Sequence, residues 1–214
     1  MARRPKQRPS SDNRTTRPGS ALSGAPGSDA GDARADAGAV GSGPAGRTPL
    51  KVWVAMGSDS DLPVMEEATK TLHAFGIPYE VDITSAHRTP HDAALLASGL
   101  EANGFGVAIL GAGHAAHLAG VVAAHTTLPV IGVPLPSSSL QGLDALLSTV
   151  QMPGGVPVAT VAIGRSGAQN AAILAAQILA IGDPALRARL RDHKDQMARK
   201  VAEKNRALKS VPRP

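Results

Sequence analysis

The stretch Tyr79-Glu-Val-Asp-Ile-Thr-Ser-Ala-His-Arg-Thr-Pro90 decides the fold that the sequence predicts. Its first five residues form an apolar run typical of a short strand, and a helical pattern begins at its last two. A strand followed directly by a helix is typical of an open α/β sheet, in which ligands bind at the carboxyl ends of the strands. At that position the chain carries a hydroxyl, an imidazole and a guanidinium, on Ser85, His87 and Arg88. Because an imidazole exchanges protons near neutral pH and a guanidinium pairs with phosphate or carboxylate, the stretch also indicates a site.

The same alternation of strand and helix occurs five times along the chain. Apolar runs predict strands at residues 50–56, 78–84, 106–110, 129–133 and 157–163. Helical patterns follow them and end near residues 75, 103, 125, 150 and 180, with Thr89 predicted to cap the second helix. We therefore predict an α/β, flavodoxin-like three-layer sandwich with a five-stranded parallel sheet of order 2-1-3-4-5.

The net charge of +5 is unevenly distributed and divides the chain into three parts. Residues 1–48 carry eight Lys/Arg against four Asp, and residues 183–214 carry ten Lys/Arg against four Asp/Glu. The middle part, 49–182, carries four Lys/Arg against nine Asp/Glu and is predicted to be the catalytic domain. With one Leu, one Val and no aromatic residue, residues 1–48 cannot bury enough apolar surface to fold, so we predict a disordered basic tail.

Residues 184–208 predict one long C-terminal helix. Its apolar stripe is narrow and consists of Leu186, Leu190, Met197, Val201 and Leu208. A stripe of this width suits packing on another subunit or on the outside of the domain, and an ordinary solvated helix remains the alternative. Four aromatic residues in the whole chain are too few for base stacking, and no apolar run approaches the roughly 18 residues of a membrane span. We expect neither a nucleic-acid nor a membrane partner.

The chain contains no cysteine, which excludes disulfides and thiolate chemistry and fits a cytoplasmic location. His114 and His117 are three residues apart, a spacing that could suggest a metal site. A third strong ligand is not evident, so no metal is predicted.

Polar or glycine-rich residues follow each of the first four predicted strands. They are Ser58, Asp59, Ser60 and Asp61, then Ser85, His87 and Arg88, then Gly111, Gly113, His114 and His117, and then Ser137, Ser138 and Ser139. Because the carboxyl ends of parallel strands share one edge, these residues predict one polar pocket. Glycines let backbone N–H groups approach an anion, and Arg88, followed by Arg165, is the leading cation for a phosphate. Asp61 suits a ribose hydroxyl, although it could simply cap the first helix.

Six stretches, taken together and in order, resemble one known family. They are Met56-Gly-Ser-Asp-Ser-Asp61, Ser85-Ala-His-Arg-Thr-Pro90, Gly111-Ala-Gly113 with Ala115-Ala-His-Leu118, Pro129-Val-Ile-Gly-Val-Pro134, Gln151-Met-Pro153, and Ala162-Ile-Gly164 with Asn170-Ala-Ala172. Over roughly residues 50–205 the chain resembles the class I 5-(carboxyamino)imidazole ribonucleotide mutases, the PurE-type subunit of de novo purine synthesis.

The resemblance implies an isomerase that moves a carboxylate from the exocyclic nitrogen of N5-carboxyaminoimidazole ribonucleotide to ring carbon C4. It implies no metal and no cofactor, a proton-shuttling His87, and a second catalytic residue, His117, among those that line the pocket for the base and CO2. The substrate-binding residues that it implies are Ser58, Asp61, Ser85, Arg88, Gly111 and Gly113. It also implies a cytoplasmic homo-octamer in which the C-terminal helix, within residues 183–214, reaches across subunits.

The sequence departs from the family pattern at two positions, where His114 replaces a glycine and Ala119 replaces a proline. If the first position needs a positive φ, a histidine there costs roughly 1–2 kcal/mol. An altered pocket at His114 leaves open a non-catalytic module that binds a phosphoribosyl ligand. The closest enzyme alternative is direct carboxylation of the unsubstituted aminoimidazole ribonucleotide.

Overall fold

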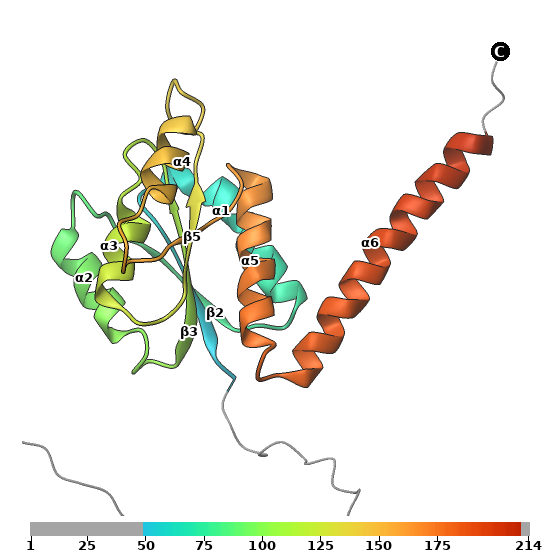
Figure 1. Cartoon of the computed structure of the whole chain (residues 1–214), viewed down its shortest axis with the longest axis horizontal. Helices are drawn as coiled ribbons and strands as arrows, with labels where there is room; N and C mark the ends of the chain where they lie inside the picture. The colour runs from blue at the N-terminus through green and yellow to red at the C-terminus, as the bar shows by residue number, and fades with distance from the viewer. Residues whose placement is uncertain (1–48, 211–214) are drawn as a thin grey trace, which may run out of the picture. The chain divides into compact units, whose positions relative to one another are not determined.

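The computed structural model describes residues 49–210, and the predicted disorder of residues 1–48 lies outside the described residues (Figure 1). The strands are β1 (Lys51–Met56), β2 (Tyr79–Ile83), β3 (Phe105–Ala112), β4 (Val130–Pro134) and β5 (Ala159–Thr160). The helices are α1 (Leu62–Ala74), α2 (Pro90–Gly99), α3 (Leu118–His125), α4 (Leu143–Val150), α5 (Arg165–Leu179) and α6 (Pro184–Ser210), and a short 3-10 turn, η1 (Asp59–Asp61), precedes α1.

The five strands form one parallel sheet in the order β2-β1-β3-β4-β5, which confirms the predicted topology. Met56, the last residue of β1, lies opposite Ile83 at the end of β2 and opposite Gly111 near the end of β3. Ala112 in turn lies opposite Pro134 at the end of β4. Four strands therefore end at the same level, and the loops that follow them meet at one edge of the sheet.

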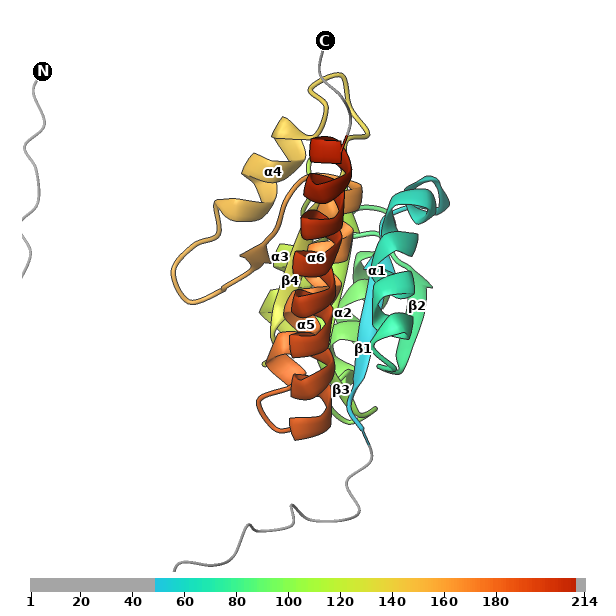
Figure 2. The same ribbon diagram turned by 90° about the vertical axis from the view of Figure 1, so that its right-hand side faces the viewer.

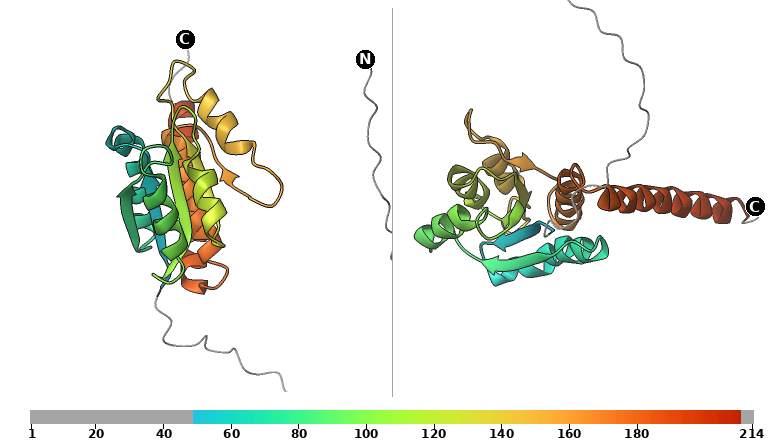
Figure 3. Two further views of the ribbon diagram at one scale, coloured as in Figure 1. Left: turned by 90° about the vertical axis from the view of Figure 1, so that its left-hand side faces the viewer. Right: turned by 90° about the horizontal axis from the view of Figure 1, so that it is seen from below.

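Helices cover both faces of the sheet, as the predicted three-layer sandwich requires. On the first face α1 and α5 lie side by side (Figure 2) and enclose Val52 and Val54 of β1. On the second face α2 and α3 (Figure 3) enclose Trp53 and Ala55. Successive residues of a strand point to opposite faces, so a strand covered on both sides is apolar throughout. Trp53 is 1% exposed, and its indole Nε1 donates to Asp82 Oδ2 at 2.7 Å.

Three predicted elements have the wrong bounds. The third strand was expected at residues 106–110, but β3 spans Phe105–Ala112 and so includes Gly111. The fifth strand was expected at residues 157–163, but only Ala159–Thr160 pair with β4 in the ladder. Beyond the ladder the chain still follows β4, because Val161 N donates to Gly132 O at 3.1 Å. The second helix ends at Gly99 rather than near residue 103, and turns follow as far as Gly104, which has a positive φ of 78°.

Helix α6 packs on the rest of the chain only through its first turns. Leu186 is buried, and Leu190 is partly buried against the core on the first face of the sheet. The centre of the His193 ring lies 5.3 Å from the centre of the Phe75 ring. Further along the predicted apolar stripe, Val201 is 67% and Leu208 65% exposed. The described single chain therefore leaves most of this stripe uncovered. No helix within residues 49–210 is long and apolar enough to cross a bilayer.

Candidate active site at the carboxyl edge of the sheet

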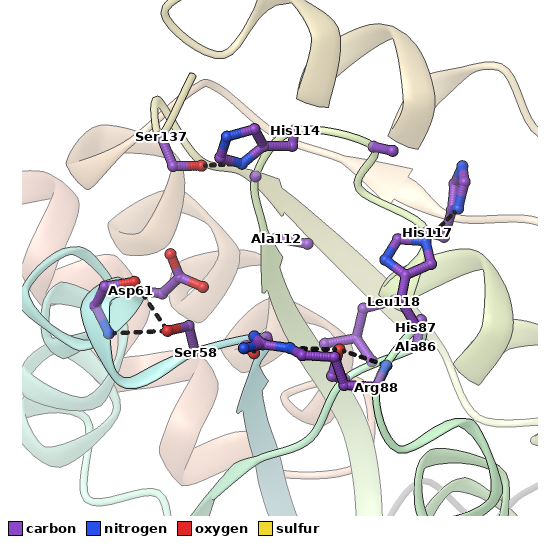
Figure 4. Close-up of a pocket in the computed structure, with 15 residues that line it drawn as sticks. Ser58, Asp61, Ala86, His87, Arg88, Ala112, His114, His117, Leu118 and Ser137 are labelled. Carbon is purple, nitrogen blue, oxygen red and sulfur yellow. Dashed lines mark hydrogen bonds between the residues drawn. The ribbon is translucent and has the colours of Figure 1, made fainter. Parts of the chain in front are cut away.

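A pocket of about 500 Å³ lies where the loops after β1, β2, β3 and β4 meet (Figure 4). Seven of the eight predicted site residues line it: Ser58, Asp61, Ser85, His87, Arg88, Gly113 and His117. His114 also lines the pocket. The remaining lining residues are small, apolar or hydroxyl-bearing: Gly57, Ser60, Ala86, Ala112, Ala115, Leu118 and Ser137. Because four strands end at the same level, residues from four separate loops meet in one cavity.

Two histidines, His87 after β2 and His117 after β3, form a pair in this pocket. His87 Nε2 lies 2.8 Å from His117 Nδ1, and the rings meet edge to face at an angle of 71° with their centres 4.9 Å apart. A contact this short between two imidazole nitrogens requires a proton on one of them and a lone pair on the other. The pair can therefore hold and relay a proton. The sequence named both residues, but nothing in it indicated that they touch.

The guanidinium of Arg88 is hydrogen-bonded to the loop that follows β1. Its Nη2 donates to the carbonyl oxygen of Gly57 at 2.6 Å, and its backbone N–H donates to Ser85 Oγ at 3.1 Å. The predicted cap is wrong in one respect: the Thr89 hydroxyl forms no cap bond to α2 but accepts from Ser85 N at 3.0 Å. The hydrogen bond between Ser85 and Thr89 thus closes a turn, and this turn fixes the backbone position of Arg88.

The acidic end of the pocket is formed by the turn η1. Ser58 Oγ accepts from Ser60 N at 3.3 Å and caps this turn. Asp61, which is 9% exposed, makes no side-chain cap bond to α1, so its carboxylate stays available inside the pocket. Burial raises the pKa of Asp61 above its usual value, although the Ser58 hydrogen bond and the nearby His114 and Arg88 act in the opposite direction.

The two glycines of the third loop serve different contacts. Gly111 does not line the pocket but lies in β3, where an added Cβ would be 2.5 Å from Met65 Sδ of α1. Gly113 lines the pocket, and a Cβ there would overlap the hydroxyl of Ser137, so glycine lets the loops after β3 and β4 approach closely. His114 adopts a positive φ of 54°, and its Nδ1 lies 3.3 Å from Ser137 Oγ.

Arg165, the second predicted phosphate ligand, lies outside the pocket. Its Nη1 pairs with Glu67 Oε1 at 2.9 Å and joins α5 to α1 on the surface. His114 and His117 do not converge either, because His117 contacts His87 and His114 contacts Ser137. Among residues 49–210, no group of three His, Cys, Asp or Glu side chains is placed to hold a metal ion.

Comparison with known proteins connects this pocket to one family. The family model described as AIR carboxylase matches residues 51–200, more than half of the chain. The N5-carboxyaminoimidazole ribonucleotide mutase of Pyrococcus horikoshii is 55% identical over 160 residues, which cover 75% of this chain and 89% of that protein. The mutase of Mycobacterium tuberculosis is 55% identical over 168 residues, which cover 78% of this chain and 95% of that protein.

The similarity extends to solved structures. The crystal structure of Treponema denticola PurE is 32% identical, with a TM-score of 0.69, and the match covers 75% of this chain and 99% of that chain. In sequence, the mutase of Escherichia coli K12 is 48% identical over 155 residues, covering 72% of this chain and 92% of that protein. The matched region contains the whole sheet and every loop of the pocket. The chain belongs to the AIR carboxylase family, in the branch of the PurE-type mutases.

Proposed function

We propose that this chain is an isomerase of purine biosynthesis that converts N5-carboxyaminoimidazole ribonucleotide to 4-carboxy-5-aminoimidazole ribonucleotide. Relatives that carry the mutase name are 55% identical over three quarters of the chain, which supports this activity. The observation that carries the chemistry is the histidine pair, His87 and His117, in contact at 2.8 Å inside a pocket that also contains Arg88.

The reaction needs one proton to be given and one to be taken. When the N–C bond of the carbamate breaks, the electron pair stays on nitrogen, CO2 is released, and the nitrogen gains a proton. Ring carbon C4 then adds to the CO2 and must lose its own proton before the ring becomes aromatic again. The product is an isomer of the substrate, so a single group that donates a proton and later recovers one completes the cycle.

The histidine pair fits this requirement. An imidazole changes protonation near neutral pH, so it can act as acid and base in the same turnover. The contact between His87 Nε2 and His117 Nδ1 lets the second ring store or supply the proton while the first faces the substrate. We assign the proton transfer to His87 and its support to His117.

The rest of the pocket fits the ribose phosphate of the substrate. Arg88 and the hydroxyls of Ser58 and Ser85 suit the phosphate, because a guanidinium offers paired charged donors. The carboxylate of Asp61 suits a ribose hydroxyl. Small side chains at Ala86, Ala112 and Ala115 let the walls close on the ligand, which helps to retain CO2 between the two steps.

We also propose a cytoplasmic homo-octamer, as the family resemblance implies. Leu143, Leu147 and Val150 lie on one face of α4 and are each about half exposed in the single chain. Exposed apolar faces of this kind mark interaction sites. A second copy of the chain is the partner that would cover this face and the stripe of α6.

The function is tested with purified full-length protein and two substrates. Conversion of the carbamate substrate, followed by product absorbance against the uncatalysed rate, is expected for the wild-type protein. His87→Asn is expected to lower kcat by about 10²–10⁴-fold, the usual contribution of a general acid–base group, with the circular dichroism spectrum unchanged.

A matched control is His73→Asn, which replaces an exposed histidine at the end of α1 and should turn over like the wild type. Turnover of His87→Asn at the wild-type rate would refute the assignment. Turnover of the unsubstituted ribonucleotide with CO2, in place of the carbamate, would identify a direct carboxylase, and binding without turnover would identify a binding module.

A further inference from the structure

His114 combines three features that the function described above leaves unused. The first is its backbone, which has a φ of 54°, in the left-handed region that only a few per cent of non-glycine residues adopt. The other residue of this kind among 49–210 that is not glycine, Gln141, lies on an exposed loop outside the pocket. Non-glycine residues in such conformations persist where their surroundings hold them, and they cluster at ligand sites.

The second feature is the position of the side chain. The imidazole lines the pocket, and its Nδ1 lies within hydrogen-bond distance of Ser137 Oγ, at 3.3 Å. Figure 4 shows this ring beside Ser137 and apart from His87 and His117. Because Nδ1 is turned toward Ser137, the other ring nitrogen, Nε2, remains for a ligand in the pocket.

The third feature is the charge around the ring. Burial raises the pKa of Asp61, and the charge of His114 opposes that increase. The hydrogen bond from Ser138 lowers the pKa of Asp144 on α4, and His114 adds to the decrease. Both carboxylates therefore lie close enough to the imidazole for its charge to act on them.

We propose that His114 is a substrate-positioning residue that binds an anionic oxygen of the substrate through Nε2. The inference rests on the proposed function, because the substrate of that reaction carries two anionic groups, a phosphate and a carboxyl. Arg88, on the loop after β2, provides one cationic contact, and His114 provides a second from the loop after β3. A charged imidazole donates a stronger hydrogen bond to such an oxygen than a neutral side chain does.

His114→Asn is the informative variant. Asparagine tolerates a positive φ, and its amide oxygen can accept the hydrogen bond of Ser137, but it carries no charge at any pH. His114→Gly is the second variant, because glycine adopts this φ freely and keeps the fold intact if asparagine does not. The control is His125→Asn, which changes an exposed histidine at the end of α3 that does not line this pocket.

The measurement is the affinity for the carboxylated ribonucleotide product by calorimetry, together with kcat and KM, at pH 6.5 and pH 8.5. We expect His114→Asn and His114→Gly to weaken binding and raise KM about tenfold at pH 6.5, with kcat within about twofold of the wild type. At pH 8.5, where an imidazole is uncharged, the difference should shrink to about twofold or less. Asp61 and Asp144 interact with this imidazole, and Arg88, His87 and His117 line the same pocket. Wild type and His125→Asn, measured at both pH values, give the pH dependence that these groups contribute.

Ribose 5-phosphate identifies the anionic group that is bound. If its affinity falls with that of the full ligand, His114 binds the phosphate, and if only the carboxylated ligand is affected, His114 binds the carboxyl. Unchanged affinity in both variants, or a loss of the same size at both pH values, would overturn the inference. Wild-type protein that binds the product without turnover would instead refute the proposed function, and the affinity ratios would still test His114.

Discussion

Asp61 shows how the pocket uses a residue that reduces the stability of the folded chain. Its carboxylate is largely buried without a cap bond to α1, and burial raises its pKa. A raised acid pKa means that the folded state disfavours the charged form, so at neutral pH the ionised group lowers the free energy of unfolding. This penalty shrinks as the pH falls below the raised pKa of the folded state, and it is gone below the usual carboxyl pKa, where both states are protonated.

Asp61→Asn is therefore expected to raise the thermal midpoint at pH 7 and to raise KM for the ribonucleotide about tenfold, since a charged hydrogen bond is lost. The gain in stability should shrink as the pH is lowered toward 4, which thermal melts across that range would measure. Asp92→Asn, which changes an exposed carboxylate in the first turn of α2, is the control and should show no such gain. An Asp61→Asn protein that is less stable than the wild type at pH 7 would contradict this account.

The residues of the pocket could be predicted from the sequence, but their contacts could not. Chemistry-bearing residues after strand ends are visible in the sequence, which is why His87, Arg88 and His117 were found. The hydrogen bond between His87 and His117 joins residues 30 positions apart, and it depends on how the two loops leave the sheet. No periodicity encodes that direction.

At the scale of elements, Gly111 sets the distance between α1 and β3. The sequence predicted that this glycine would contact the ligand, but Met65 occupies the space where its side chain would be. Met65 is fully buried, so its thioether has little room to move away. A glycine in a strand interior often marks such a close approach.

Gly111→Ala is expected to destabilise the fold by about 1–3 kcal/mol, the usual cost of overpacking a core. Denaturant unfolding followed by circular dichroism would measure this difference. In a Met65→Ala background, Gly111→Ala should cost less stability than it does in the wild type, because the side chain with which it clashes is then absent. Strictly additive effects in this cycle would show that Gly111 and Met65 are not the interacting pair.

The bounds of the elements were predictable where local chemistry sets them. The strand ending at Met56 and the helix stop at Gly76, with its positive φ of 64°, follow from an apolar run and a glycine. The fifth strand was predicted too long because its length depends on pairing with β4, which a single run does not reveal. The Thr89 hydroxyl accepts from Ser85 N instead of capping α2 for a similar reason: it had two candidate partners, and the sequence does not show which one it binds.

At the scale of the whole molecule, the stripe of α6 is the feature that a single chain leaves unexplained. Val201 and Met197 are 67% and 47% exposed on a helix that packs on α5 only near its start. If the proposed homo-octamer uses this stripe, Val201→Glu should reduce it to smaller species, because a carboxylate cannot be buried there without a partner. Multi-angle light scattering at a fixed protein concentration would report the change in mass.

Arg199→Glu is the matched control for that variant. It introduces the same side chain about 200° around the helix from Met197, away from the stripe, and should leave the mass unchanged. Equal masses for the wild type and Val201→Glu would contradict the proposed role of this helix.

The burial of Trp53 has a practical consequence for all of these measurements. It is the only tryptophan in the chain, it is 1% exposed in the central strand β1, and its indole is bonded to Asp82. Its fluorescence should therefore be blue-shifted in the native protein and move to longer wavelength when the sheet opens to water. The protein therefore carries an intrinsic optical reporter of global unfolding, because this indole is part of the core on the second face of the sheet.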